Sequence, residues 1–118
     1  MYEIIFYQDG RGRQPVYEYL KELLQRKDKN SRINANKIND YIQMLSEHGT
    51  RAGEPYVKHL SGEIWELRPL RNRILFAAYN NRVYVLLHFF IKQTQKTPNR
   101  EIEQARRNLS DFKGRKRD

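Results

Sequence analysis

Two arginines, Arg68 and Arg73, are the strongest candidates for chemistry in this sequence. A tight turn at Leu70-Arg71 would place them opposite each other on neighbouring antiparallel strands. Like charges that face each other across a sheet destabilise it unless an anion neutralises them. Because an arginine fork donates two hydrogen bonds to a phosphate, the pair predicts a phosphate-binding site.

Groups that could transfer protons accompany the two arginines. Cleaving RNA without a metal needs a base for the 2′-hydroxyl, an acid for the leaving 5′ oxygen and cations for the charged phosphorane. Glu66, His88 and Lys92 are the candidates for proton transfer. Each also has a structural interpretation. Glu66 could be an ion-pair partner of the arginines, His88 a hydrogen-bonded residue at the core edge, and Lys92 a solvated residue at a strand end.

Four further side chains could hold the rest of an RNA strand. Lys58 and His59 reach the sheet from the preceding loop. The strand period places Tyr84 and Phe90 on the charged face, where aromatic rings can stack on unpaired bases. A protein partner could instead cover these two rings.

Metal and cysteine chemistry are poorly supported by the sequence. The three histidines, His48, His59 and His88, lack the spacing of metal ligands, and no HExxH motif exists. The absence of cysteine excludes disulfides, thiolate metal sites and a cysteine nucleophile. We therefore expect no metal and no cofactor.

Length and charge limit the function classes. A chain of 118 residues with a net charge of +9 predicts one domain that attracts polyanions or an acidic protein partner. We expect that domain over residues 1–112, followed by a basic tail over residues 113–118. Neither a membrane span nor a signal peptide is predicted, and a reducing cytoplasm is the simplest location.

The stretch Glu63–Lys92 must position the candidate residues. It predicts three consecutive antiparallel strands, whose residues alternate between two faces. A two-residue turn at Asn80-Asn81 would place Arg73 opposite His88, because asparagine tolerates positive φ. Arg68, Arg73 and His88 would then form one row on an open polar face. The buried face would collect Trp65, Leu67, Ile74, Phe76, Ala78, Val83, Val85, Leu87, Phe89 and Ile91.

The first half of the chain predicts a strand and two helices. Tyr2–Tyr7 is rich in aromatic and β-branched residues, which is typical of a strand. A helix should begin at Pro15 and run to about Lys27. Ser31 is the expected N-cap of a second helix, and Gly49 should end it.

The remaining elements complete an α+β domain. Thr50–Leu60 is predicted to be a loop, and Thr97-Pro98 should open a last helix. The element order is therefore β-α-α-β-β-β-α, with a small, mainly antiparallel sheet and all helices packed on one face. The apolar stripe of the last helix consists of Ile102, Ala105, Leu109 and Phe112.

These motifs together resemble a known family. The segment IWELRPLRNRILFAAY, followed by LLHFFIKQTQKTP and a helix beginning EIEQA, resembles the phage-derived, HigB-like toxins of the RelE/ParE superfamily. The likeness covers essentially the whole chain. Arg68 corresponds to the arginine of the family's ELR motif, Arg73 to the arginine opening the next strand, and Lys92 to the first lysine of an F-x-K-K-T segment. Gln93 stands where many relatives have a second lysine, although Lys96 is close by.

The resemblance implies the compact microbial-RNase fold and an endonuclease that cuts translated mRNA on the ribosome. It also implies a helix-turn-helix antitoxin (HigA-like) as partner, in a complex expected to be a heterotetramer. That complex would repress its own operon, so operator DNA would be contacted only through the antitoxin. No membrane partner is implied.

The residue patterns and the resemblance give one hypothesis. Both arginines would bind the scissile phosphate, and Glu66, His88 or Lys92 would share proton transfer. Replacing Arg73 by Ala should abolish toxicity without unfolding the protein. Basic residues of the Gly10–Arg13 loop, of the last helix and of the segment before it would grip phosphates of the message or ribosome. These residues are Arg11, Arg13, Lys96 and Arg100.

Two other functions remain open from the sequence. ParE-like members of the superfamily inhibit DNA gyrase by protein binding and have no nuclease site. A non-catalytic RNA-binding module would keep its affinity for RNA without cutting it. Whether RNA is cut separates both alternatives from the nuclease.

Overall fold

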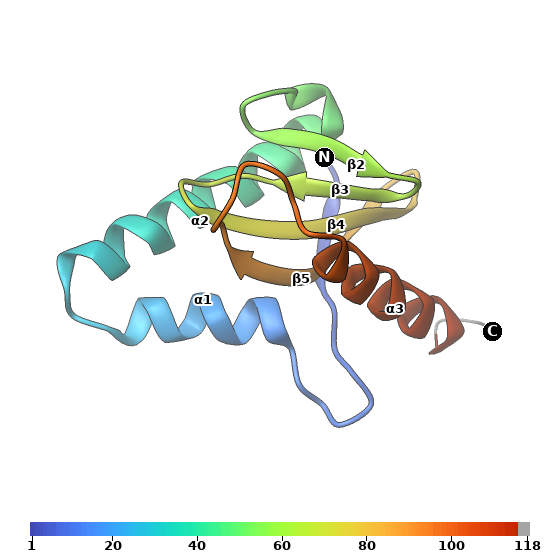
Figure 1. The fold of residues 1–118 in the computed structure, drawn as a ribbon, viewed down its shortest axis with the longest axis horizontal. Helices are drawn as coiled ribbons and strands as arrows, with labels where there is room; N and C mark the ends of the chain where they lie inside the picture. The colour runs from blue at the N-terminus through green and yellow to red at the C-terminus, as the bar shows by residue number, and fades with distance from the viewer. Residues whose placement is uncertain (116–118) are drawn as a thin grey trace.

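A computed structural model describes residues 1–115 of the chain (Figure 1). The helical segments and strands follow one another along the chain in the order β-α-α-3₁₀-β-β-β-β-α. Among these residues, no helix is both long and apolar enough to cross a bilayer. The elements are β1 (Glu3–Phe6), α1 (Pro15–Gln25), α2 (Lys29–His48), the 3₁₀ helix η1 (Gly49–Ala52), β2 (Val57–Ser61), β3 (Ile64–Leu67), β4 (Asn72–Asn80), β5 (Val83–Ile91) and α3 (Asn99–Arg115).

The five strands form one sheet in the order β1-β5-β4-β3-β2. All neighbours are antiparallel except β1 and β5, which run parallel. This confirms the α+β class and the mainly antiparallel sheet. It also corrects the expected loop Thr50–Leu60, because the end of that segment forms β2. That strand is short, follows Gly53 and Pro55, and has few buried side chains, so its sequence lacks a strand pattern.

Helices cover both faces of the sheet, so the prediction that they pack on one face is wrong. Side chains of α1 and α2 form one core with Ile74 and Phe76 of β4, and side chains of α3 form a second core with Leu75 and Ala77. Neighbouring residues of a strand point to opposite faces. Both faces of β4 are therefore apolar, and the face expected to be open is largely covered by α3.

The turn between β3 and β4 has the predicted register. Leu67 pairs with Ile74, and the Asn72 amide donates to the Pro69 carbonyl at 3.0 Å. Leu70 adopts a φ of 59°, a left-handed conformation that closes the turn. The positions just beyond this last pair are Arg68 and Arg73, which places the two arginines opposite each other as expected.

The register between β4 and β5 differs from the prediction. Arg73 lies opposite Phe90 rather than His88, and His88 lies opposite Leu75. The pairs Leu75–His88 and Phe76–Leu86 leave Leu87 as an extra residue, which is a β-bulge. A bulge reverses the alternation beyond it, so Val85 and Leu87 face α3 instead of sharing the core of α1 and α2.

The hairpin turn itself explains part of this shift. Asn80 pairs with Val83, so the connecting residues are Asn81 and Arg82 rather than Asn80 and Asn81. The Asn80 side chain accepts a hydrogen bond from the Arg82 amide at 2.8 Å. Such a local bond from asparagine to the backbone stabilises a turn that begins at Asn80.

Both ends of α2 are fixed by single residues. Asp28, not Ser31, is the N-cap, and its carboxylate accepts from the Ser31 amide at 2.9 Å and from the Ser31 hydroxyl at 2.8 Å. Ser31 therefore lies one turn inside the helix. Gly49 ends α2 as predicted, with a φ of 62°. A Cβ at Gly49 would lie only 2.8 Å from the Tyr84 hydroxyl, so glycine is required there.

The helix α3 extends further than expected. It continues through Lys113 to Arg115, whose guanidinium donates to Asp111 at 2.6 Å. The predicted tail over residues 113–118 is therefore wrong for its first three residues, and its last three, 116–118, lie outside the described residues.

Candidate active-site groove

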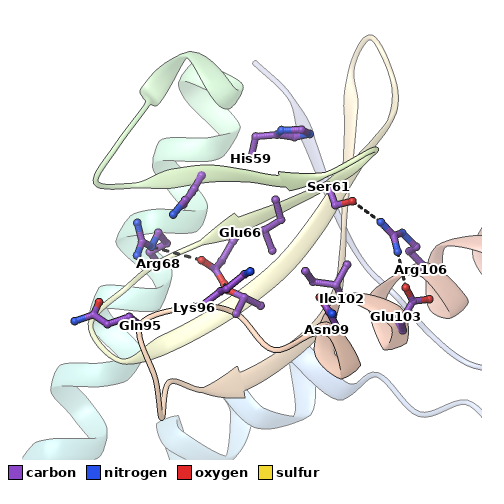
Figure 2. Close-up of a pocket in the computed structure, with 13 residues that line it drawn as sticks. His59, Ser61, Glu66, Arg68, Gln95, Lys96, Asn99, Ile102, Glu103 and Arg106 are labelled. Carbon is purple, nitrogen blue, oxygen red and sulfur yellow. Dashed lines mark hydrogen bonds and ion pairs between the residues drawn. The ribbon is translucent and has the colours of Figure 1, made fainter.

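A groove of about 470 Å³ opens between the β2–β3 edge of the sheet and the segment that leads into α3 (Figure 2). Figure 1 shows this segment, in orange, rising from the end of β5 before it turns into α3. The groove therefore lies on the α3 face, at the edge that α3 leaves uncovered. Its lining consists of Lys58, His59, Leu60, Ser61, Glu66, Arg68, Gln95, Lys96, Thr97, Asn99, Ile102, Glu103 and Arg106.

Glu66 forms the floor of the groove and is only 1% exposed. Its Oε2 accepts a hydrogen bond from the Thr97 hydroxyl at 2.5 Å. Its Oε1 lies 3.5 Å from Arg68 Nε and 3.9 Å from Arg73 Nε. A carboxylate can be buried only when it is paired and hydrogen-bonded. Thr97 and the two arginines meet that need and hold the carboxylate in one place.

The two arginines have different environments. Arg73 is 6% exposed, and its Nη1 donates to the carbonyls of Leu70 and Asn72 at 2.8 and 2.9 Å. Burial lowers the pKa of Arg73, an effect that the nearby Glu66 opposes. Arg73 therefore holds the β3–β4 turn together. The expectation that Arg73→Ala leaves the fold intact is not supported, because two turn carbonyls would lose their donor.

Arg68 is the arginine that a ligand can reach. Its side chain is 23% exposed and lines the groove. Within residues 1–115, its buried Nε has no hydrogen-bond partner. Its contact there is the 3.5 Å ion pair with Glu66 Oε1, so this nitrogen is held by charge attraction alone. Figure 2 shows the Arg68 side chain beside Glu66.

Lysines add positive charge along the same groove. Lys58 lies directly opposite Glu66 in the β2–β3 ladder, so both side chains share the α3 face. Lys96 lies in the segment before α3 and lines the groove from the other side. Both were predicted as RNA-binding residues, and the structure brings them together with Arg68.

His59 sits at the rim. It pairs with Trp65 in the ladder, and the two rings lie 5.0 Å apart. Its Nε2 lies 2.8 Å from the Gly62 carbonyl, which fixes this nitrogen as the protonated one. In Figure 2 the His59 ring lies on the far side of β2 from Glu66. His59 is therefore near the groove but does not point at its floor.

The far end of the groove holds a residue that the sequence did not identify. Arg106 donates from Nη2 to the Ser61 hydroxyl and from Nη1 to Glu103, both at 2.5 Å (Figure 2). Arg106 lies outside the apolar stripe predicted for the last helix, and nothing in the spacing places it beside the groove. Only the presence of β2, which carries Ser61, shows that this side of α3 faces the groove.

A second, smaller cavity of about 130 Å³ lies on the other side of the segment Gln95–Thr97. It contains Lys92, Arg100 and Phe90, together with the buried Arg73. Lys92 was predicted to share the catalytic site with Glu66, but these two residues line different cavities.

Two predicted site residues have structural environments instead. His88 Nε2 lies 2.7 Å from Glu101 Oε1, and this contact joins β5 to α3. Tyr84 is 7% exposed in the core of α1 and α2, where its hydroxyl accepts from the Thr50 amide at 3.2 Å. The row of Arg68, Arg73 and His88 and the stacking role of Tyr84 are therefore both wrong.

Arg11 and Arg13 lie apart from the groove. They follow β1, which is one edge of the sheet, whereas the groove lies at the opposite edge beside β2. Their backbone amides donate to the Asp9 carboxylate at 2.8 and 2.9 Å. These bonds shape the loop, and the predicted role in RNA binding stays a prediction.

The groove favours an anion over a metal. Among the described residues, no three His, Asp or Glu side chains gather closely enough to hold a metal ion. The charged residues lining the groove, His59 aside, are four cations and two carboxylates, and both carboxylates are already paired with arginines. They are Lys58, Arg68, Lys96, Arg106, Glu66 and Glu103.

Comparison with known proteins identifies the family. No curated protein matches the sequence. A family model described as "Phage derived protein Gp49-like (DUF891)" matches residues 21–110, which run from α1 into α3 and include every residue that lines the groove. The chain belongs to this family of phage-derived, Gp49-like proteins.

Proposed function

We propose that the protein is a toxin that cuts mRNA within this groove, without a metal. The observation that carries the proposal is the arrangement of Glu66. A buried carboxylate is held by Thr97 and two arginines at the floor of a groove whose other charges are mostly positive. This combination offers a proton acceptor and a phosphate-binding arginine side by side.

The proposed reaction assigns one task to each group. Arg68 and the groove lysines bind the scissile phosphate and stabilise the added negative charge of the phosphorane. Glu66 Oε1 accepts the proton of the 2′-hydroxyl as the 2′ oxygen bonds to phosphorus. The bond to the 5′ oxygen breaks, and Lys58 or Lys96 protonates that oxygen. The products are a 2′,3′-cyclic phosphate and a 5′-hydroxyl.

The cellular setting follows from the family resemblance of the sequence. We propose that translated messages on the ribosome are the substrate and that a helix-turn-helix antitoxin neutralises the toxin, in a complex that binds operator DNA through the antitoxin. The net charge of +9 suits binding to ribosomal RNA and to an acidic antitoxin segment.

The test is to map new 5′ ends across mRNAs after inducing the protein in a bacterial host. Wild type should create cuts in coding regions and arrest growth. Arg68→Ala should reduce the cuts about 100-fold or more, because it removes the main donor to the phosphorane. Lys37→Ala is the matched control: it removes one exposed cation from α2, which packs on the opposite face of the sheet.

Two outcomes would contradict the proposal. Growth arrest with intact messages would indicate a protein target such as gyrase. Cuts that persist at the wild-type level in a folded Arg68→Ala variant would place the chemistry elsewhere on the protein.

A further inference from the structure

The segment Gln95–Thr97 separates two cationic cavities. Residues 95–97 line the groove on one side and the smaller cavity on the other, so the two share a wall. Lys96 belongs to both linings. An anion in either cavity would thus be close to the same ammonium group.

The smaller cavity has an excess of positive charge. Its ionic lining comprises Arg73, Lys92, Lys96 and Arg100 against the single carboxylate of Glu101. That carboxylate is already engaged, because its Oε1 lies 2.7 Å from His88 Nε2 and its Oε2 lies 3.6 Å from Arg100 Nε. Lys92 and Lys96 therefore have no ion-pair partner among the residues that line this cavity.

The size of the smaller cavity limits its ligand. A volume of about 130 Å³ equals about four water molecules at about 30 Å³ each. This space suits a phosphate group and is too small for a nucleoside. The cavity also lies at the start of α3, which begins at Asn99, and the helix dipole there favours negative charge.

We propose that this second cavity binds the phosphate next to the scissile phosphate on the same RNA strand, so that the strand crosses over Gln95–Thr97. The inference rests on the proposed function for the identity of the strand. It gives Lys92 and Arg100 a role in holding the neighbouring phosphate rather than in the chemistry. The substrate then has to extend beyond a dinucleotide.

The test uses trideoxynucleotides, which cannot be cleaved because they lack the 2′-hydroxyl. One probe has two charged linkages, and two further probes each carry one neutral methylphosphonate linkage. In wild type, the fully charged probe should bind about tenfold more tightly than either neutralised probe, as expected for loss of a charge-assisted contact. Fluorescence anisotropy at fixed salt measures the affinities.

The double variant Lys92→Gln/Arg100→Gln should no longer bind the fully charged probe much more tightly than the neutralised probes. Its preference for the fully charged probe should fall below about twofold, because only the main groove still binds a phosphate. Lys37→Ala should keep the wild-type preference. Circular dichroism checks that each variant is folded, and Arg100 is an exposed side chain whose replacement leaves the core untouched.

The outcomes separate the two proposals. The second phosphate site does not exist if the double variant keeps the tenfold preference for the fully charged probe. The same conclusion follows if wild type binds the fully charged probe no more tightly than the neutralised probes. If wild type binds none of the probes, both this site and the proposed RNA-binding groove are contradicted. If Lys58→Gln weakens every probe while the double variant behaves as wild type, only the second site fails.

Discussion

The two faces of the sheet bury different kinds of polar side chain. On the face covered by α1 and α2, the buried polar side chain contributed by the sheet is Asn72, a neutral group. It accepts from the Tyr19 hydroxyl at 2.5 Å and donates to Asn34 at 2.8 Å. On the face covered by α3, the buried polar groups are the charged pair Glu66 and Arg73.

This difference indicates where function lies. A neutral network that satisfies itself stabilises a fold and needs no ligand. A buried ion pair often stabilises a protein no more than well-packed hydrophobic residues of similar volume would. Stability alone therefore does not explain why Glu66 and Arg73 are buried at the groove. We infer that the α1–α2 face maintains the fold and the α3 face holds the chemistry.

The largest effect on stability should come from the first face. Phe76 is fully buried in the core of α1 and α2. Phe76→Ala should lower the free energy of unfolding by about 4 kcal/mol, because a cavity remains in the core. Urea denaturation measures this change, and the protein that remains folded should still cleave RNA at the wild-type rate. A cleavage defect without loss of stability would contradict the division between the faces.

Glu66→Gln should affect both properties. It leaves the guanidinium of Arg73 buried without a countercharge, which should cost about 3 kcal/mol of stability. It also removes the proposed base, so cleavage should fall about 100-fold or more. The two effects are separated by measuring cleavage at a temperature where the variant is folded. Full cleavage by folded Glu66→Gln would remove Glu66 from the mechanism.

A substitution at Thr97 tests whether the orientation of the Glu66 carboxylate affects the cleavage rate. Thr97→Val removes the hydroxyl that donates to Glu66 Oε2 but keeps the shape of the side chain. Stability should fall by about 2 kcal/mol, as for a hydrogen bond to a charged acceptor. The cleavage rate constant should fall about tenfold with little change in RNA affinity. Thr97→Ser should restore both, and equal loss in Val and Ser variants would contradict a positioning role.

The smallest effect concerns the other end of α3. Tyr7 donates to Asp111 at 2.6 Å, and burial together with this bond raises the pKa of Tyr7 to about 12. The unfolded chain loses the tyrosine proton near pH 10, so this contribution to stability is complete below pH 10 and is lost as pH rises through 12. Stability should drop by about 1 kcal/mol by pH 11 from this group. Tyr7→Phe should flatten that part of the pH profile, and an unchanged slope would refute the assignment.

Local signals in the sequence predicted some elements well. Pro15 begins α1, Gly49 ends α2, and the turn at Leu70 gives the register that places Arg68 opposite Arg73. Each of these depends on the backbone preference of a few neighbouring residues. The α+β class was also predicted, and four of the predicted site residues, Lys58, Glu66, Arg68 and Lys96, line one groove.

The remaining features depend on tertiary packing. The bulge at Leu87 changes which side chains face α3, and a strand that is apolar on both faces offers no pattern that marks such a shift. For the same reason, the sequence could not show that α3 covers the face expected to be open. Arg106 reaches the groove only because β2 adds a fifth strand at that edge.

The most direct test of the account is the chemistry of the cut ends. Induction of wild type and of Lys37→Ala should produce messages with new 5′-hydroxyl ends and 2′,3′-cyclic phosphates, which ligation specific for 5′-hydroxyl RNA detects. Arg68→Ala should yield at least about 100-fold fewer such ends while remaining folded. New ends that carry 5′-phosphates, or 5′-hydroxyl ends at the wild-type level in Arg68→Ala, would contradict attack by the 2′-hydroxyl in this groove.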